Sequence, residues 1–345
     1  MFELSLPLWG DVLLFVGAAT VIGVAGVATA SFADRLADRT GLGEALTGTV
    51  FLGFVTALPG LAASVAAALA GYPALAISNA LGGIAVQTAA LAVADIAYKR
   101  ANLEHAAASA PNMMQACMLV ALMVLVLVGL SAPNVTVLRI HPATIGLTAT
   151  AGVAFWLVYR TRKDPMWRPT QTDETVQDEP EEEHKRQSLR WLASGLIVAA
   201  AITAVAGVGV AQAAQNLVAE TAIPETIVGG LFMAVATSLP ELVTSVAAVR
   251  RGALTLAVSD IVGGNFFDVL FVAAADAAYF SGSLFHGPGV GQKEVFLTSM
   301  AILLNVVLLT GLIYRQKHGP ANIGFESVLM LVIYLGGFVV LSLGF

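Results

Sequence analysis

Ten long apolar segments divide the chain and limit what it can fold into. A bilayer core about 30 Å thick is crossed by an α-helix of about 20 apolar residues, and each segment approaches or exceeds that length. Only 12% of the residues are charged and 57% are hydrophobic, whereas globular domains carry roughly 25% charged residues. The pattern therefore predicts an all-α polytopic membrane protein with ten transmembrane helices. The segments cover residues 9–31, 45–70, 73–98, 112–131, 142–160, 190–214, 225–249, 254–280, 294–314 and 325–344.

One long polar stretch, residues 161–189, separates the fifth apolar segment from the sixth. In a ten-helix arrangement it lies on the same side as 15 of the 17 lysines and arginines. Because cytoplasmic loops are enriched in these residues, we expect a cell (inner) membrane protein with a cytoplasmic central loop and both termini outside. The acidic run of this loop, Asp173–Glu183, lacks the alternating ligands of a calcium-binding loop and is interpreted as a solvated linker.

The two halves of the chain are related by an internal repeat. Residues 26–98 match residues 207–279 without a gap, at a constant offset of 181 positions. The match keeps rare residues in register, among them Pro59 with Pro240 and Asp95 with Asp276. The copies lie five apolar segments apart, and this odd number gives them opposite topology. We therefore expect two inverted five-helix repeats, residues 1–160 and 190–345, an architecture typical of secondary transporters.

Two kinds of residue are expected to interrupt the repeated helices. Pro59 and Pro240 each lack a backbone donor and open the preceding turn. The glycine pairs at 82–83 and 263–264 permit a bend, or alternatively a close approach between helices. In secondary transporters, interrupted helices from both repeats meet near the middle of the membrane and form the substrate site. We therefore expect functional residues near these four positions.

Polar residues surround Pro240 inside an apolar segment. Glu241 follows the proline, and the hydroxyl side chains of Thr237 and Ser238 precede it. A charged residue in a membrane helix costs about 2.5–3.5 kcal/mol on insertion scales, so it indicates a functional site. Carboxylates, hydroxyls and loosened backbone carbonyls are the oxygen ligands that hard cations prefer. The alternative interpretation is a kinked packing helix whose hydroxyls bond their own backbone.

A second carboxylate, Asp268, lies near the middle of the eighth segment, three positions after Asn265. This spacing places the two residues on one helix face. The first copy has Gln87 where the second has Asp268, and Gly60 where the second has Glu241. The sequence therefore predicts a cation site whose carboxylates come only from the second copy.

The run TSLPELVTS followed by GGNFFD, with a degenerate inverted copy, resembles the cation/calcium exchanger superfamily of sodium/calcium exchangers and their relatives. The resemblance covers both repeats. It implies a bundle of ten helices that exchanges a divalent cation, usually Ca²⁺, for Na⁺ or H⁺ by alternating access. The implied metal ligands, with Asn265 added from its place beside Asp268, are the Ala234 carbonyl, Thr237, Ser238, Glu241, Asp268, Thr56, Gln87 and Asn265.

The first copy departs from this family at Gly60, where a second glutamate is usual. The two remaining carboxylates give a charge of −2, which neutralises one Ca²⁺ but does not balance three Na⁺. We therefore expect changed stoichiometry, weaker calcium binding or a different transported cation. The sequence leaves the coupling ion and the oligomeric state open.

Other functional classes find less support in the sequence. It contains no nucleotide motif, nucleophile–base pair or hydrolytic metal motif, and its basic residues lie only at segment ends, which argues against nucleic-acid binding. We expect neither an enzyme nor a bound cofactor, and the expected partners are inorganic cations and the lipid bilayer. The alternative is a transport-inactive relative that acts as a cation sensor or membrane scaffold, which the lost acidic residue favours.

Three further aspartates carry weaker predictions. Asp95 and Asp276 lie near the ends of their segments, where solvation at the membrane interface accounts for them. Asp260 precedes Asp268 by about two helical turns, and the sequence leaves it open between a role in supporting the ligands and a role at a helix end.

Overall fold

The computed structural model describes residues 6–40, 47–98, 102–170, 188–251, 254–317, 319 and 323–343, and this part of the chain is almost entirely helical. The acidic run at 173–183 lies outside the described residues. The elements are α1 (Leu8–Thr40), α2 (Thr47–Thr56), α3 (Leu58–Leu69), α4 (Pro73–Ala97), α5 (Leu103–Ala107), α6 (Ala110–Ser131), α7 (Pro142–Lys163), α8 (Leu189–Glu220), α9 (Glu225–Ile227), η2 (Val228–Met233), α10 (Ala234–Thr237), α11 (Leu239–Arg251), α12 (Leu254–Ala278), η3 (Leu284–His286), α13 (Gln292–Tyr314) and α14 (Phe325–Leu343).

Eight helices of the described residues are long and apolar enough to cross a membrane, namely α1, α4, α6, α7, α8, α12, α13 and α14. A ninth span results if the bent run from α9 to α11 is counted as one. The sequence predicts ten, and the difference lies in the segment at 45–70, which is divided between the shorter helices α2 and α3. Most helix ends agree with the sequence prediction within a few residues. The exceptions are α1 and α8, which continue to Thr40 and Glu220.

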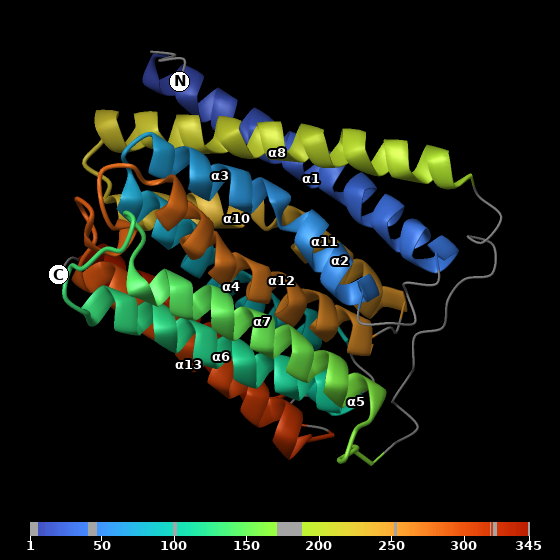
Figure 1. Cartoon of the computed structure of the whole chain (residues 1–345). Helices are drawn as coiled ribbons and strands as arrows, with labels where there is room; N and C mark the ends of the chain where they lie inside the picture. Colours follow the sequence, from blue (N-terminus) through green and yellow to red (C-terminus); the bar gives the residue numbers. More distant parts are fainter. Residues whose placement is uncertain are drawn as a thin grey trace.

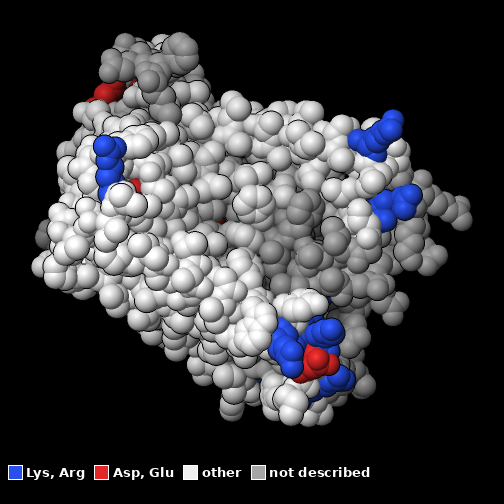
Figure 2. All heavy atoms as spheres, viewed as in Figure 1, with Lys and Arg blue, Asp and Glu red and all other residues white. Residues whose placement is uncertain are grey.

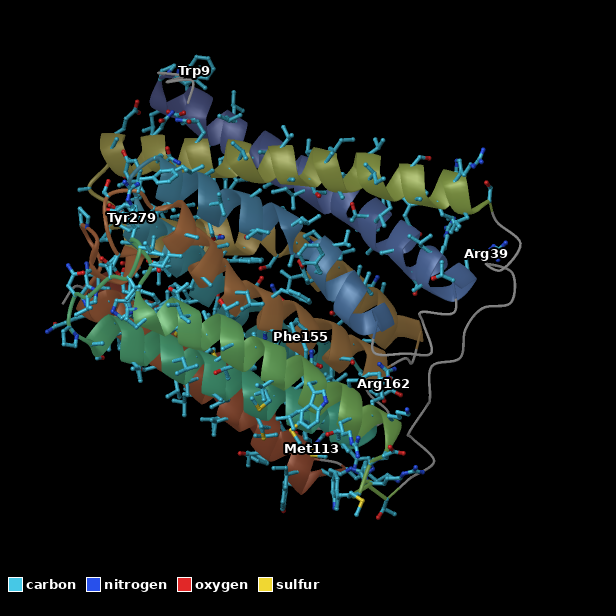
Figure 3. All side chains as sticks on the ribbon, in the orientation of Figure 1. Trp9, Arg39, Met113, Phe155, Arg162 and Tyr279 are labelled. Atoms are coloured by element: carbon cyan, nitrogen blue, oxygen red, sulfur yellow. The ribbon has the colours of Figure 1, made fainter. Side chains whose placement is uncertain are left out.

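The helices form a bundle in which α4 and α12 are central. In the most apolar 18-residue stretch of each helix, 83% of the residues of α4 and 72% of those of α12 are buried, compared with 17% for α1. In Figure 1, α1 and α8 run side by side along one flank, while α6, α7 and α13 lie on the opposite flank. Trp9 and Tyr279 lie at one end of the bundle, and Arg39 and Arg162 at the other (Figure 3). The apolar outer faces and polar ends are typical of helices surrounded by lipid.

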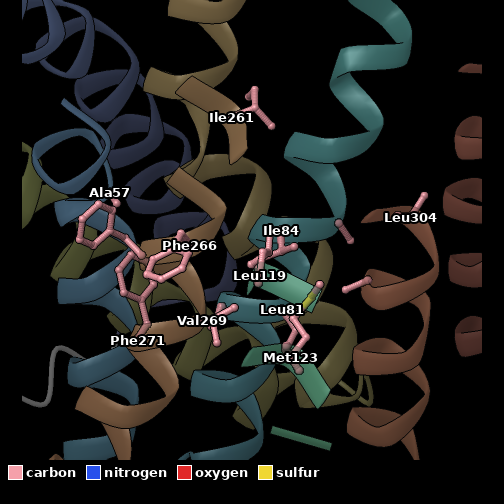
Figure 4. Packing of buried hydrophobic residues seen from close by; sticks show 14 of the residues in the cluster. Ala57, Leu81, Ile84, Leu119, Met123, Ile261, Phe266, Val269, Phe271 and Leu304 are labelled. Carbon is pink, nitrogen blue, oxygen red and sulfur yellow. The ribbon is translucent and has the colours of Figure 1, made fainter. Parts of the chain in front are cut away.

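The core between the central helices combines large apolar side chains with alanines and glycines. Phe266 and Phe271 of α12 pack with Ala57, close to Leu81 and Ile84 of α4 (Figure 4). All five side chains are at most 4% exposed. Small residues allow membrane helices to approach closely, which provides van der Waals packing where lipid removes much of the hydrophobic driving force.

The two prolines interrupt their helices, as predicted. Helix α2 ends at Thr56 and α3 begins at Leu58, while α10 ends at Thr237 and α11 begins at Leu239. The second break bends the chain by 50°. Both breaks follow from the missing proline N–H and from the clash of its ring with the preceding turn.

The prediction that the glycine pairs interrupt α4 and α12 is wrong, because both helices run through them without a break. Glycine keeps its backbone N–H, so the hydrogen-bond ladder continues. The pairs instead permit close approach, which was the alternative interpretation. A Cβ at Gly82 would overlap the backbone of Gly230. Gly230 belongs to the π-helical turn η2, which sequence periodicity does not reveal and which lies against α4.

Asp95 and Asp276 are not solvated at the membrane interface, which corrects their sequence-based interpretation, because they are 0% and 1% exposed. The Asp95 carboxylate accepts hydrogen bonds from Leu103 N at 2.6 Å, Gly324 N at 3.2 Å and Ser327 Oγ at 2.7 Å. Three such bonds satisfy a buried carboxylate. They join α4 to the segment at α5 and to the start of α14, and we call this group the Asp95 corner.

Asp276 makes the corresponding set of bonds at the opposite end of the bundle. Its carboxylate accepts from Leu284 N at 2.8 Å, His141 N at 2.9 Å and Thr144 Oγ1 at 2.6 Å. These bonds join α12 to η3 and to the start of α7, and we call this group the Asp276 corner. Leu103 and Leu284 are 181 positions apart, the same offset as the sequence repeat. The repeat therefore extends from sequence to hydrogen bonding.

Candidate cation site

Two glycines hold the broken helices in place by allowing close approach across the halves of the molecule. A Cβ at Gly26 of α1 would overlap the Pro240 ring, and a Cβ at Gly207 of α8 would overlap the Pro59 carbonyl. Gly26 and Gly207 occupy the same register of the repeat. Each half therefore packs its long first helix against the proline break of the other half.

The two carboxylates expected to bind the cation are buried beside these breaks. Glu241 lies in the first turn of α11 and is 1% exposed, and Asp268 lies within α12 and is 4% exposed. The first turn of a helix carries partial positive charge, which favours a carboxylate there. The Thr56 hydroxyl of α2 lies within hydrogen-bond reach of the Glu241 carboxylate. Glu241 Oε2 has no hydrogen-bond donor among the described residues, so this oxygen is available to a ligand.

Gln87 of α4 links the second carboxylate to the proline break. Its Nε2 donates to Asp268 Oδ2 at 2.8 Å and to Ser238 Oγ at 3.0 Å. The nitrogen must face Asp268, because an ionised carboxylate only accepts hydrogen bonds. The Gln87 amide N–H groups therefore bond to oxygens of Asp268 and Ser238 that a bound cation would otherwise contact. Gln87 Oε1 is buried and has no donor in the described part of the chain.

Thr237 belongs to a second polar group on the other side of the break. Its hydroxyl donates to Asn79 Oδ1 at 3.2 Å and to the Ala234 carbonyl at 3.3 Å. Asn79 Nδ2 in turn donates to Ser64 Oγ at 2.9 Å and to the Gly60 carbonyl at 3.2 Å. The Ala234 carbonyl also accepts from Ser238 N, so it is engaged in the helix and offers only its second lone pair.

Asn265 is not part of these groups. Its Nδ2 donates to Thr88 Oγ1 at 3.0 Å, and Asn305 of α13 donates to the same hydroxyl at 3.3 Å. A spacing of three positions turns a helix by about 300°, so Asn265 and Asp268 flank a common face but contact different neighbours. The structure thus brings together the side chains of Glu241 and Thr56, and those of Asp268, Gln87 and Ser238.

The second glycine of each pair lies at the candidate site, in agreement with the expectation that functional residues lie near the glycine pairs. A Cβ at Gly83 would lie 3.0 Å from Asp268 Oδ2, and one at Gly264 would lie 3.1 Å from Gln87 Oε1 and 3.5 Å from Glu241 Cγ. Larger residues at either glycine would therefore fill the space beside the ligands.

Phe271 occupies the place where the first copy lacks a glutamate. A Cβ at Gly60 would lie 2.7 Å from the Phe271 ring, which is 4% exposed. In the register of the repeat, Phe271 corresponds to Ala90, as Gly60 corresponds to Glu241. Gly60 therefore packs against a large ring, whereas the equivalent positions of the other copy hold a carboxylate and a small residue in the sequence. The aligned sequence contains this reciprocal exchange of residues. Only the contact between Gly60 and the Phe271 ring explains why the two positions differ together.

Asp260 links α12 to α11 one helical turn beyond Glu241. Its Oδ2 accepts from Thr244 Oγ1 at 2.8 Å and from Ser245 Oγ at 3.4 Å. Its Oδ1 is buried without a donor among the described residues. Of the two roles that the sequence left open, these contacts favour support of the helix that carries Glu241.

The chemistry of the site suits a hard cation held by few charges. Within the described ranges, no three His, Cys, Asp or Glu side chains converge in a way that holds a metal ion. A bound cation would therefore take Glu241 and Asp268 as its charged ligands, and hydroxyl, amide or carbonyl oxygens as the remainder. Oxygen ligands of this kind suit Ca²⁺ or Na⁺ and not a soft transition metal.

The sequence matches the family model described as sodium/calcium exchanger protein over residues 10–161 and 191–344. Its fold also resembles a solved structure of the sodium-calcium exchanger NCX_Mj. The TM-score is 0.63 at 16% sequence identity, covering 95% of this chain and 97% of that one. This likeness concerns the arrangement of the helices.

Several curated relatives match parts of the chain. It is 26% identical over 117 residues to the sodium/calcium exchanger MaX1 of Methanosarcina acetivorans, covering 32% of each chain. It is 29% identical over 150 residues to the inner membrane protein YrbG of Escherichia coli, covering 44% of this chain and 41% of that one. It is 44% identical over 117 residues to the human sodium/potassium/calcium exchanger 5, covering 33% and 23%. The chain thus aligns with less than half the length of each.

Proposed function

Because the chain belongs to the sodium/calcium exchanger protein family, we propose that it is a secondary active antiporter that moves Ca²⁺ or a related cation across the membrane in exchange for Na⁺ or H⁺. The family match confirms the resemblance drawn from TSLPELVTS and GGNFFD. Transport proceeds by alternating access, in which the cation exchanges its hydration shell for protein oxygens. The process requires no covalent step.

The proposed architecture has ten spans arranged as two inverted five-helix repeats. It counts α2 with α3 as one broken span and the run from α9 to α11 as another, in addition to the eight continuous helices. The reciprocal contacts of Gly26 with Pro240 and of Gly207 with Pro59 support this pairing. The matching Asp95 and Asp276 corners, at opposite ends of the bundle, support the inversion.

The observation that carries the proposal is a pair of buried carboxylates beside a broken helix, with oxygens left free. Glu241 Oε2 and Gln87 Oε1 are both buried without a donor in the described part of the chain. Buried polar groups are normally hydrogen-bonded, and exceptions call for a ligand or a function. A cation that enters between Glu241 and Asp268 displaces the Gln87 amide nitrogen from Asp268 and engages the amide oxygen.

The first copy, with Gly60 and Phe271 in place of a carboxylate, supports a site of charge −2. Such a site holds one divalent cation or two monovalent cations, and two carboxylates cannot balance three Na⁺. We therefore propose a stoichiometry of fewer coupling ions per divalent cation than the family usually shows. The Phe271 ring supports this proposal because it occupies space that an additional ion and its water would need.

The proposed orientation places the end with Arg39 and Arg162 in the cytoplasm (Figure 3). Figure 2 shows the lysine and arginine side chains of the described residues toward the ends of this face. The positive-inside rule favours the more basic end as cytoplasmic. The central loop is then cytoplasmic and both termini lie outside.

The proposal is tested by ⁴⁵Ca²⁺ uptake into liposomes that contain the purified protein. An outward Na⁺ gradient is applied first and an outward H⁺ gradient second. Uptake that depends on one gradient, and is lost in Glu241→Gln, identifies an exchanger and its coupling ion. Specific cation binding without flux under either gradient, for Ca²⁺ and for other divalent cations, would overturn the proposal in favour of a sensor or scaffold. The exchanger relatives do not favour that alternative.

A further inference from the structure

The Asp95 corner contains two buried glutamates that the proposed transport does not use. Glu104 of α5 and Glu326 at the start of α14 are both 0% exposed. Their carboxyl groups lie within hydrogen-bond reach of each other. Apart from this mutual contact and each residue's own backbone N–H, their four oxygens have no hydrogen-bond partner among the described residues.

The pair is tightly enclosed by the end of α13. A Cβ at Gly311 would lie 2.8 Å from Glu326 Cγ and 3.1 Å from Glu104 Cγ. Only a glycine at this position leaves room for both side chains. The two glutamates are therefore held against each other by packing, and neither has space to turn toward solvent.

The Asp276 corner provides an internal comparison, because it has the same backbone and no acidic pair. Aligned on the hydrogen bonds to the two aspartates, Glu104 corresponds to Phe285 and Glu326 to Ala143. A Cβ at Gly129 would likewise lie 2.7 Å from the Phe285 ring and 2.9 Å from Ala143 Cβ. The fold therefore accommodates an apolar pair at this place, and the glutamates are not required to build the corner.

Two ionised carboxylates cannot share this enclosure, because burial and mutual repulsion both oppose the second charge. Among the described residues, no cationic side chain donates a hydrogen bond to their four oxygens. The Arg315 guanidinium donates to the His105 and Thr170 carbonyls, and the His105 ring bonds the Arg315 carbonyl. Tyr314 is 67% exposed, and Asp95 is itself an acid saturated by hydrogen bonds. A proton shared between two facing carboxyl groups removes one of the two charges and gives each group a hydrogen bond.

We propose that Glu104 and Glu326 form a proton-binding site, separate from the cation site, in which one proton is shared between the two carboxyl groups and joins α5 to α14. The site lies at the end of the bundle that carries α5 and the end of α7 (Figure 1), which is the cytoplasmic end in the orientation proposed above. Loss of the proton places two negative charges in contact and loosens α5 from α14 and α13.

Glu104 lies in α5, outside the eight spans, and burial raises its pKa well above the ordinary value, with further contributions from Asp95 and Glu326. A carboxyl group whose pKa is higher in the folded protein than in the unfolded chain favours folding most at low pH. This contribution is fully present below the unfolded pKa and is lost as the pH rises through the folded pKa. Because the pKa of Glu104 is raised by burial, we expect this contribution to be lost as the pH rises above the ordinary glutamate range.

The direct test is infrared difference spectroscopy of the full-length protein, without divalent cations, across this pH range. Wild type is compared with Glu326→Gln, whose amide replaces the shared proton with a permanent donor and preserves the fold. The difference spectrum is expected to show a protonated carboxyl group that disappears as the pH rises through a value above the ordinary glutamate pKa. Protonated carboxyl groups at the cation site cancel, because both proteins contain them.

A second variant, Glu104→Phe combined with Glu326→Ala, transfers the apolar pair of the Asp276 corner to the Asp95 corner. We expect its Tm to lose the fall with rising pH that wild type shows in this range. We also expect the protection factors for hydrogen exchange at residues 103–107, which are corrected for the intrinsic pH dependence of exchange, to become independent of pH. Wild-type pH dependence in this variant would overturn the inference, as would a difference spectrum without a protonated carboxyl group. In the difference between wild type and Glu326→Gln, where the carboxylates of the cation site cancel, a carboxylate signal that changes with added Na⁺ or Ca²⁺ would overturn it in favour of a metal site. None of these outcomes depends on the proposed transport.

Discussion

The two proline breaks share a backbone arrangement but differ in what surrounds them. Each proline packs against a glycine from the other half, Gly26 at Pro240 and Gly207 at Pro59. At Pro240 the next residue is a buried glutamate, whereas at Pro59 the next residue is Gly60, which packs against the Phe271 ring. The missing carboxylate has therefore been replaced by apolar packing and has left no open space. The two halves therefore share their architecture and differ in ligand chemistry.

The largest expected effect on cation affinity comes from removing the one carboxylate at these breaks. Glu241→Gln retains the shape of the side chain but removes its charge. A charge-assisted contact contributes about 1.5–3 kcal/mol, so we expect Ca²⁺ or Na⁺ affinity to fall by about 100-fold while the fold is retained. Isothermal titration calorimetry measures the affinity. Glu220→Gln, at the exposed end of α8, is the matched control, and equal affinities in the two variants would place the cation elsewhere.

The Asp95 and Asp276 corners test whether the corresponding hydrogen bonds of the two halves contribute equally to stability. Each aspartate accepts hydrogen bonds from two backbone N–H groups. In Asp95→Asn and Asp276→Asn, the amide nitrogen replaces one of the accepting oxygens and removes the negative charge. Loss of charge-assisted hydrogen bonds costs about 1.5–3 kcal/mol, and we expect the two variants to lower Tm by similar amounts. Thermal unfolding in detergent measures this. A Tm loss confined to one variant would show that the corners differ in energy although their hydrogen bonds correspond.

The smallest expected effect restores the carboxylate that the first copy lacks. Gly60→Glu alone forces its side chain into the Phe271 ring, and overpacking of this kind costs about 1–3 kcal/mol. We expect a lower Tm and no gain in cation binding from this single change. Gly60→Glu with Phe271→Ala copies the Glu241–Ala90 combination of the other half. The double variant should recover part of the Tm and bind divalent cations more tightly than the single variant.

Phe271→Ala alone is the control for this pair, because it opens a cavity without adding a charge. Removal of a buried phenylalanine side chain costs about 3–5 kcal/mol. If Gly60→Glu were as stable as wild type, the Phe271 ring would not occupy the glutamate position and the reciprocal exchange between the halves would be incidental.

The sequence predicted those features that follow from local chemistry. Apolar length located the helices, and the missing N–H of proline located both breaks. The cost of a carboxylate in a membrane helix singled out Glu241 and Asp268, although their binding of a cation stays a prediction. These inferences needed no knowledge of which segments touch.

Features that depend on neighbours could not be predicted in the same way. The continuity of α12 through Gly263 and Gly264, and the orientation of Asn265 toward Thr88, are decided by the helices packed against them. Glu104 was missed because its segment is short and polar residues near a loop are ordinarily solvated. It is enclosed by Gly311 of α13 and Glu326 of α14, which lie more than two hundred positions away along the chain.

The contacts of Gln87 with Ser238 and Asp268 have a consequence for how the molecule is assembled. The donor comes from one half of the chain and both acceptors come from the other, so the candidate site resembles the interface of a dimer whose subunits have been fused. Neither half possesses the site by itself. A substitution that shifts one half relative to the other would therefore change the ion affinity before it unfolds any helix.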